Sequence, residues 1–312
     1  MDLPPSLVRL AACQDGIVTR QQALQHGLTV AAVRHLLGRG GRWQRMVTGV
    51  YATFTGPLQE RHLIRAGLLF AGPSAMVTGT TACRAYGLKY VPASGRPELL
   101  VPERVQRARI PIARIRRTRI LPAARQVRSF PCAPPERAAV DACRDQLVLR
   151  PVRALLCEIV QRGLATPDQL VATLVGGPSA GSALPRRALE DVMAGCRSAP
   201  ECELRDLLSG SHVLPEARWN HPLPDPRGAG LVPDARLDEA RLVIEIDSVE
   251  WHRFGETPEM TERRRARLAA LGWTVLPVSP RRIRKEPVAV LGEIEAAYLA
   301  GIARAGRRPE AV

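Results

Sequence analysis

The sequence predicts an α/β protein, α+β overall, that is built from more than one domain. Its 312 residues exceed what one typical hydrophobic core holds together. Hydrophobic residues make up 46% and charged residues 24%, which is the composition of a globular chain. Helical periodicity and strand-like alternation occur in separate blocks along the chain. We therefore expect three domains, at residues 1–56, 57–197 and 198–305, and a short tail at 306–312.

Residues 1–56 predict helices followed by a hairpin. Residues 6–13 have a short helical pattern. Thr19 can cap a second helix, and Thr29 can cap a third, whose apolar residues recur at helical spacing. Residues 43–54 then alternate around Gly49 in the manner of two hairpin strands. Because helix, helix, turn, helix and hairpin is the order of a winged helix-turn-helix, we expect that fold here.

The charge of the chain predicts a polyanionic partner, most plausibly nucleic acid. Lys and Arg number 45 and Asp and Glu 30, which gives a formal net charge of +15. In a winged helix the third helix would enter the major groove, and the hairpin would lie near phosphates. The expected DNA-binding residues are Thr29, Arg34, His35, Arg39 and Arg42. The alternative is that this basic unit is a small structural domain or a protein-binding module.

The middle block, residues 57–197, mixes helical and strand-like segments. Nine arginines and no acidic residue lie between Arg104 and Arg128, where Arg and Ile partly alternate as in a half-exposed strand. Thr166 and Pro167 provide the cap and first residue of a later helix. We expect a mixed α/β domain that links the two ends of the chain.

The last block, residues 198–305, has its own order of elements. A helix capped by Ser198 is followed by three strands, a helix that ends at Gly272, another strand and a closing helix with Pro287 near its start. This order predicts an α/β sandwich.

Three carboxylates fall together in this predicted sandwich. Glu245 and Asp247 lie two residues apart in an apolar strand, so they share a face, and a hairpin partner can bring Asp234 beside them. Three carboxylates repel one another unless a divalent cation lies among them, and hard oxygen ligands suit Mg²⁺ or Mn²⁺. A surface hairpin is the alternative, but carboxylates inside an apolar run are costly unless they are paired or bind a metal.

Further residues are candidates for the same site. Glu201 would complete or tune it, and His252 would act as an acid, a base or a phosphate contact. Each has a structural alternative, because Glu201 also closes a capping box with Ser198, and an isolated His252 can be a structural residue. Arg263, Arg264 and Arg265, on the arginine-rich helix that follows, would bind DNA phosphates or form a solvated face.

A series of motifs between residues 198 and 300 carries a family resemblance. The motifs are Ser198-x-x-Glu201, Val232-Pro233-Asp234, Val243-Ile244-Glu245-Ile246-Asp247-Ser248, Trp251-His252, the arginine-rich helix and Leu271-Gly272-Trp273-Thr274-Val275-Leu276. In this order they resemble the restriction-endonuclease-like PD-(D/E)XK fold, in the very-short-patch-repair-like branch that occurs as a domain in many actinobacterial proteins.

The resemblance implies a metal-dependent endonuclease. Asp234 and Glu245 would bind the metal, and Asp247 would add a ligand or orient water. That branch usually has ExDG followed by His, whereas here Ser248 stands for Gly. Asp247 also replaces the Lys of the wider ExK motif, so His252 would have to assist the attack.

The N-terminal region carries a second resemblance. Residues 16–28, 39–52 and 78–88, which read GIVTRQQALQHGL, RGGRWQRMVTGVYA and TGTTACRAYGL, resemble the winged-helix region of abortive-infection type IV antitoxins. The resemblance implies DNA binding and transcriptional autoregulation.

Together these patterns predict a DNA-binding protein with a Mg²⁺-dependent or Mn²⁺-dependent endonuclease domain. The alternative is a non-catalytic, antitoxin-like regulator whose nuclease-like domain is a docking module, which the missing Lys favours. A third possibility is a toxin-antitoxin or phage-defence component with a cognate partner. The seven cysteines include no CxxC pair, and no leader or long apolar segment is evident, so we expect a cytoplasmic protein with no membrane contact and no small-molecule cofactor.

Overall fold

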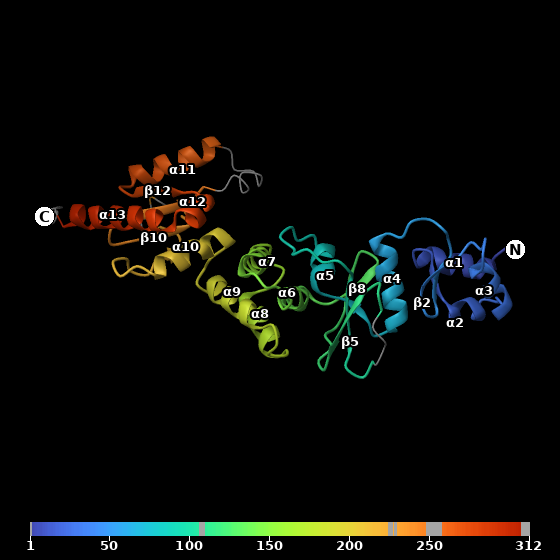
Figure 1. The fold of residues 1–312 in the computed structure, drawn as a ribbon. Coiled ribbons are helices and arrows are strands. Elements are labelled where there is room, and N and C mark those ends of the chain that lie inside the picture. Colours follow the sequence, from blue (N-terminus) through green and yellow to red (C-terminus); the bar gives the residue numbers. More distant parts are fainter. Residues whose placement is uncertain (1, 106–109, 224–226, 228–229, 248–257, 307–312) are drawn as a thin grey trace. The chain divides into compact units, whose positions relative to one another are not determined.

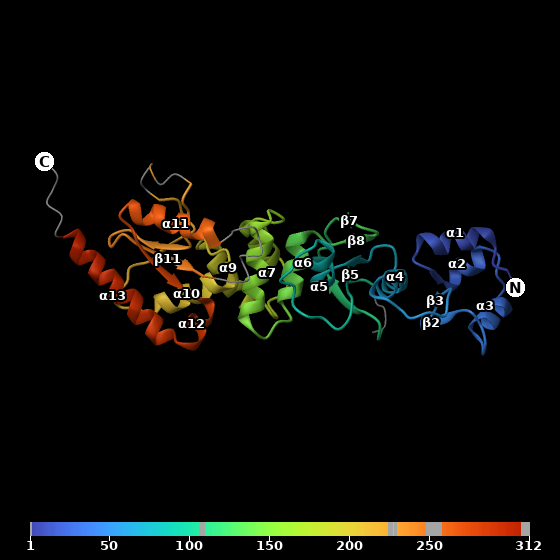
Figure 2. The same ribbon diagram turned by 90° about the horizontal axis from the view of Figure 1, so that it is seen from above.

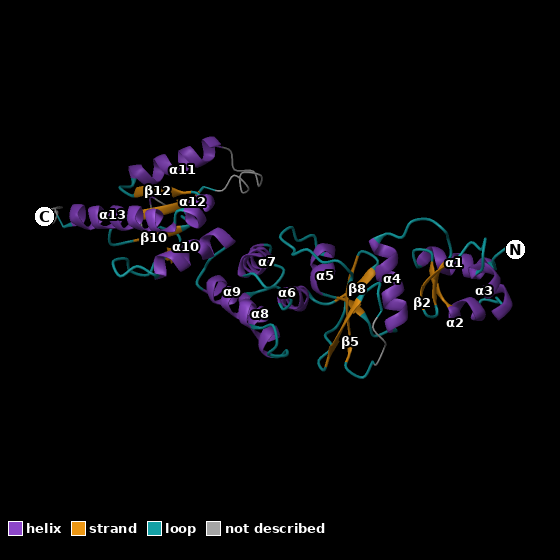
Figure 3. Ribbon diagram, in the orientation of Figure 1, coloured by secondary structure: helices purple, strands orange, loops and turns teal. Residues whose placement is uncertain are grey.

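Two compact units make up the structure, a computed structural model that describes residues 2–105, 110–223, 227, 230–247 and 258–306. Unit 1 holds Met1–Leu147 and Gly163–Leu184, and unit 2 holds Val148–Arg162 and Pro185–Val312. Both contain helices and strands (Figure 3), so the predicted α/β class is confirmed. Among the described helices, none is long and apolar enough to cross a membrane.

The N-terminal part of unit 1 has the element order of a winged helix (Figure 2). Its elements are α1 (Pro5–Cys13), β1 (Ile17–Thr19), α2 (Arg20–Gln25), α3 (Val30–Leu37), β2 (Gln44–Val47) and β3 (Val50–Ala52). The strands form a sheet in the order β1-β3-β2, and β2 and β3 are the predicted hairpin. The predicted strand pattern did not include β1, because three residues are too few for alternation to stand out.

The predicted caps of this region are present. The hydroxyl of Thr19 accepts a hydrogen bond from the N–H of Gln22 at 3.0 Å, and the hydroxyl of Thr29 accepts one from the N–H of Ala32 at 3.1 Å. Each bond satisfies a backbone donor that the first turn of a helix leaves unpaired. The start of each helix is therefore fixed by a local sequence signal.

A five-stranded sheet and five helices form the rest of unit 1. The elements are α4 (Glu60–Ala71), β4 (Met76–Val77), α5 (Gly79–Ala85), β5 (Glu98–Pro102), β6 (Arg114–Thr118), β7 (Arg125–Val127), β8 (Phe130–Cys132), α6 (Pro135–Cys143), α8 (Pro167–Val175) and the start of α9 (Ala183–Met193). The strand order is β6-β5-β4-β8-β7. Four of the nine arginines of the segment lie on β6 and β7, which are opposite edges of the sheet: Arg114, Arg116, Arg117 and Arg125.

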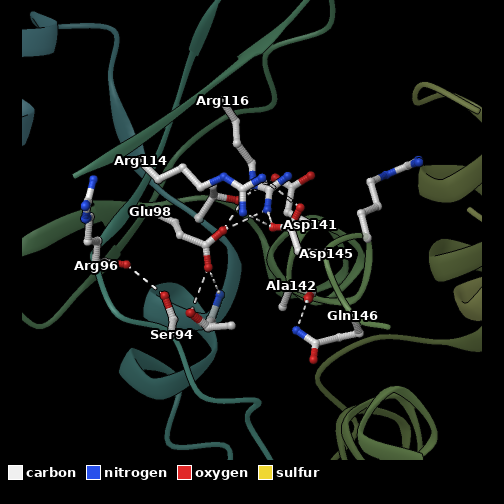
Figure 4. A network of polar contacts seen from close by, with 12 residues as sticks. Ser94, Arg96, Glu98, Arg114, Arg116, Asp141, Ala142, Asp145 and Gln146 are labelled. Carbon is white, nitrogen blue, oxygen red and sulfur yellow. Dashed lines mark hydrogen bonds and ion pairs between the residues drawn. The ribbon is translucent and has the colours of Figure 1, made fainter. Parts of the chain in front are cut away.

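Buried charged groups link this sheet to its helices (Figure 4). Glu98 on β5 accepts hydrogen bonds from the N–H and the hydroxyl of Thr80, at 3.0 and 2.7 Å, and pairs with Arg116 at 2.9 Å. Asp141 on α6 accepts a hydrogen bond from the hydroxyl of Thr78 at 2.6 Å. Both buried carboxylates therefore have hydrogen-bond donors within unit 1, and this accounts for their presence in its core.

Unit 2 contains a four-stranded sheet with helices on both faces. Its elements are α7 (Leu149–Gln161), most of α9, α10 (Ala199–Ser209), β9 (Arg218–Trp219), β10 (Ala235–Leu237), β11 (Leu242–Ile246), α11 (Pro258–Ala270), β12 (Thr274–Val278), α12 (Pro280–Lys285) and α13 (Pro287–Ala305). The strand order is β12-β11-β10-β9. The sequence predicts this order of elements except for the short helix α12.

The two faces of this sheet are covered by different helices (Figure 1). On one face, Val243 of β11 packs with Leu268 of α11 and with Trp273. The opposite side lies against α10 and α13, and Gly301 of α13 approaches Ala240 so closely that an added Cβ would lie 2.4 Å from the Ala240 carbonyl oxygen. Glu245 and Asp247 lie two and four residues after Val243, so their side chains are on the same face of β11, the face that α11 covers.

The division into units differs from the predicted boundaries at α7. This helix lies in the predicted middle block, but it packs within unit 2, where the sulfur of Cys157 is 4.0 Å from that of Cys202 on α10. Its amphipathic pattern predicts a buried face, but a helical pattern alone does not specify the packing partner. At the other end, α13 stops at Ala305, and most of the predicted tail, residues 307–312, lies outside the described residues.

Candidate functional site

The N-terminal region, residues 1–56, carries a set of exposed arginines without opposite charges. Residues 1–56 contain six arginines and two acidic residues. One of the acids, Asp15, pairs with Arg65 of α4 at 3.0 Å. Within the described part of the chain, no ion pair joins any of the six arginines to a carboxylate; they are Arg9, Arg20, Arg34, Arg39, Arg42 and Arg45. This region therefore presents positive charge to solvent, as a polyanion-binding surface does.

The third helix presents part of that charge. Val33 and Leu36 are buried, whereas Arg34 and His35 are exposed on the other side of α3. Arg39 and Arg42 are exposed in the turn between α3 and β2. Thr29 is exposed but its hydroxyl caps α3.

Three arginines of this region, Arg9, Arg20 and Arg45, were absent from the expected contacts, and Arg45 is the one in the hairpin. Arg45 is exposed on β2, in the predicted hairpin. The alternation of the strand, with buried Met46 next to it, is the signal that could have identified it.

The second candidate site is a group of carboxylates at the start of β10, the end of β11 and the start of α10, which we call the carboxylate cluster; it consists of Glu201, Asp234, Glu245 and Asp247. The antiparallel register pairs Ala235 with Ile244, so Asp234 lies opposite Glu245. The N–H of Ile246 donates a hydrogen bond to Oδ2 of Asp234 at 2.7 Å. The predicted hairpin thus brings Asp234 to the strand that carries Glu245 and Asp247.

Glu201 joins the carboxylate cluster from α10. Its carboxylate accepts hydrogen bonds from the hydroxyl of Ser198 at 2.6 Å, from the N–H of Arg197 at 2.8 Å and from the side-chain amide of Asn220. Burial, and next the charge of Asp234, raise the pKa of Glu201 to about 7, and the three donors oppose that rise. The negative charge of Asp234 thus acts directly on Glu201.

Asn220 is a part of this site that the sequence analysis did not include. It has a left-handed backbone, with φ +47°, and its N–H donates to the carbonyl of Asp234 at 3.0 Å. Its side-chain amide also donates to the carbonyl of Gly195 at 3.1 Å. Asn tolerates a left-handed backbone better than most residues. An Asn directly before a Pro-rich turn is therefore the sequence signal that could have identified this position.

Two arginines of α11 form ion pairs with carboxylates of the cluster. Arg264 forms an ion pair with Glu245, and Arg265 forms one with Asp247. We expected Arg264 to bind DNA phosphates, and in the structure it contacts a carboxylate, while Arg263 is exposed. Arg265, expected beside the site as a further phosphate contact, likewise contacts a carboxylate.

The donor chemistry of the carboxylate cluster fits a hard divalent cation, because all its ligands are carboxylate oxygens. Among the described residues, no group of three His, Cys, Asp or Glu side chains is already arranged to hold a metal ion. Two of the four carboxylates are engaged by Arg264 and Arg265. A cation would therefore have to compete with guanidinium groups.

The remaining predicted residues of this site lie elsewhere. His252, predicted as a proton-transfer group, and the adjacent Trp251 lie outside the described residues, as does Ser248. Four of the five predicted catalytic residues lie in the described part of the chain; Asp234 is bonded to β11 and its charge acts on Glu201, but no three of the four are arranged to hold a metal ion.

Comparison with known proteins identifies similar sequences from one bacterial species. No protein-family model matches the chain. Uncharacterized protein MT2308 of Mycobacterium tuberculosis strain CDC 1551 is 33% identical over 90 residues, which is 29% of this chain and 33% of the relative. Uncharacterized protein Rv2248 of strain H37Rv matches with the same values. The chain covers about a third of the length of these curated relatives.

One solved structure is also similar. The crystal structure of RV2827C protein from Mycobacterium tuberculosis matches with a TM-score of 0.41 and 20% sequence identity. The match covers 69% of this chain and 87% of that chain.

Proposed function

We propose that this protein binds duplex DNA through its winged-helix region and hydrolyses phosphodiester bonds at the carboxylate cluster with a bound Mg²⁺ or Mn²⁺. The single observation that carries the hydrolytic part is the position of Glu245, which is 2% exposed on β11 directly across from Asp234. A buried carboxylate opposite a second, half-buried one is costly, and a cation between them removes that cost.

DNA binding is supported by the exposed arginines on and after α3. Arginines without nearby carboxylates are available to replace the counterions of DNA phosphates. Arg34 and His35 would reach base edges from α3, and Arg39, Arg42 and Arg45 would contact the backbone. Thr29 would lie at the N-terminus of α3, where a phosphate is also favoured.

The carboxylate cluster offers residues for each part of a metal site. Asp234 and Glu245 would hold the cation, Asp247 would add a ligand or orient water, and Glu201 would complete or tune the site. When bound, the cation lowers the pKa of a coordinated water and stabilises negative charge on the phosphate. Asp234 is oriented for this by the N–H of Ile246, and Glu201 by Ser198 and Asn220. Proton transfer by His252 is part of the same proposal.

A second candidate function is a non-catalytic regulator that uses unit 2 for docking. The ion pairs of Arg264 with Glu245 and of Arg265 with Asp247 favour it, because they satisfy two buried or half-buried carboxylates without a cation. A regulator of this kind would bind a cognate toxin or another defence protein. Both functions fit a cytoplasmic location, where the seven free cysteines would stay reduced.

Plasmid cleavage separates the two functions. Supercoiled plasmid is incubated with the full-length protein in Mg²⁺, Mn²⁺ or EDTA at several salt concentrations. Hydrolysis predicts nicked or linear DNA with either metal and intact DNA with EDTA. Retarded but intact DNA under every condition would support the regulator, and DNA that is neither cleaved nor retarded would contradict both functions.

A further inference from the structure

We propose that Arg264 and Arg265 form a latch on the carboxylate cluster through their ion pairs with Glu245 and Asp247. Divalent cations compete for the two carboxylates, DNA phosphates compete for the two arginines, and either ligand opens the latch. This inference rests on the proposed function, because it assumes that the carboxylate cluster binds a cation. It assigns to α11 a positioning role that goes beyond a basic surface for DNA. The two arginines would control when the metal site is available.

The inner ion pair of the latch joins Arg264 and Glu245. Glu245 is almost fully buried, while the side chain of Arg264 is 27% exposed. The ion pair uses Nη2 of Arg264 and Oε2 of Glu245. Nε of Arg264 is buried and makes no hydrogen bond, so the guanidinium is held by only part of its donors. The arginine neutralises a buried charge without being fixed in place by a complete set of bonds.

The outer ion pair of the latch joins Arg265 and Asp247. The Asp247 side chain is 42% exposed and that of Arg265 is 31% exposed. Nε of Arg265 is likewise buried without a hydrogen bond. Asp247 is positioned through its backbone, whose N–H donates to the carbonyl of Val278 at 2.9 Å. The strand end therefore keeps Asp247 in position whether or not Arg265 contacts it.

Cations and arginines cannot occupy the same carboxylate oxygens. A divalent cation at Glu245 or Asp247 displaces the guanidinium and repels it, since both are positive. The displaced arginines lie beside the site on one helix, and a phosphate is the anion that would then satisfy them. Conversely, a phosphate that binds the arginines releases the carboxylates for the cation. By linkage, each ligand strengthens binding of the other.

Metal binding to arginine variants tests the first half of this proposal. Mn²⁺ is titrated calorimetrically into the full-length protein in the absence of DNA. We expect Arg264→Ala to bind Mn²⁺ about tenfold more tightly, because it removes the competitor at a buried carboxylate. Arg265→Ala should bind about threefold more tightly, because its ion pair is more exposed. Arg267→Ala removes the same charge from an exposed position of α11 and should change the affinity less than about twofold.

DNA binding in EDTA tests the second half without any metal. Asp247→Asn frees Arg265, so we expect about threefold tighter binding of a short duplex than with the wild-type protein. Glu262→Gln makes the same change of charge at an exposed position of α11 and serves as the control. Binding in both variants is measured by fluorescence anisotropy at one salt concentration.

The outcomes distinguish the latch from the metal site itself. If the wild-type protein and both arginine variants bind no Mn²⁺, the metal site and the proposed hydrolysis are wrong, and the latch with them. If the wild-type protein binds Mn²⁺ and neither Arg264→Ala nor Arg265→Ala binds it more tightly than Arg267→Ala does, the latch alone is wrong. Circular dichroism checks that each variant is folded, and if Arg264→Ala is not, Arg265→Ala and Asp247→Asn decide the result.

Discussion

Asp234 is fixed to the strand that carries Glu245 by one hydrogen bond, in which the N–H of Ile246 donates to its Oδ2 at 2.7 Å. The bond spans from the start of β10 to the end of β11, because the two strands pair in an antiparallel register. The ten residues that separate Asp234 from Glu245 in the sequence are thus the length of a short hairpin. This explains why a sequence spacing predicts a spatial cluster.

We expect Asp234→Asn to lose metal binding while it keeps its fold. The Asn side-chain oxygen can still accept the bond from Ile246, but the negative charge is gone. Cleavage should fall by a factor on the order of 10² or more. Metal-dependent cleavage of plasmid measures the effect, and the melting temperature checks the fold. Glu216→Gln, which removes an exposed carboxylate from a loop of unit 2, should cleave like the wild-type protein.

DNA binding should depend on Arg34. The Arg34→Ala variant removes an exposed charge from α3, so we expect roughly fivefold weaker binding of duplex DNA at low salt. The slope of log affinity against log salt should become shallower by about 1. Anisotropy titrations at several salt concentrations measure both values. Equal slopes for wild-type and variant proteins would remove α3 from the interface, and Arg9→Ala on α1 is the control for loss of charge.

The turn of the β2–β3 hairpin should require glycine at position 49. Gly49 has φ +76°, and an added Cβ would meet no atom within 4 Å, so the cost of substitution is backbone strain alone. We expect Gly49→Val to lower the free energy of unfolding of unit 1 by about 1–2 kcal/mol. Chemical denaturation measures it. Gly95→Ala, also in open space but without a positive φ, should be neutral, and an equally stable Gly49→Val would contradict the turn.

A larger effect is expected at Gly79, where two costs add. Its φ is +59°, and an added Cβ would lie 2.5 Å from Oε2 of Glu98, a buried carboxylate held by Thr80 and Arg116. We expect Gly79→Ala to destabilise unit 1 by about 2–4 kcal/mol. Gly163→Ala, also in unit 1, has a similar φ of +63° but open space, and should cost about 1 kcal/mol. If the two variants unfold alike, the contact with Glu98 carries no energy.

The sequence predicted the local features of this structure better than it predicted the contacts between distant elements. The caps at Thr19, Thr29 and Ser198 were predictable because a side-chain hydroxyl and its own helix are near neighbours in the chain. The position of Asp234 beside Glu245 was predictable because a hairpin joins them. Both cases depend on short separations.

Contacts between distant elements were not predictable in this way. The ion pairs of Arg264 and Arg265 depend on how α11 packs on β11, and the sequence shows only that α11 is rich in arginine. Likewise, the assignment of α7 to unit 2 depends on which apolar face it meets, and periodicity is the same for every partner. Asn220 was missed because its role depends on Glu201, which lies nineteen residues away.

The most direct test of the central claim compares wild-type protein with Glu245→Gln on the same DNA. Both are incubated with a labelled duplex in Mn²⁺, and product and bound DNA are measured in parallel. We expect the wild-type protein to form product and Glu245→Gln to form none while it binds the duplex equally well or more tightly, because Gln keeps the shape of Glu245 and removes its charge. Glu216→Gln, in an exposed loop of unit 2, should cleave normally. Equal cleavage by Glu245→Gln and the wild-type protein would contradict the assignment of the carboxylate cluster as the site of hydrolysis.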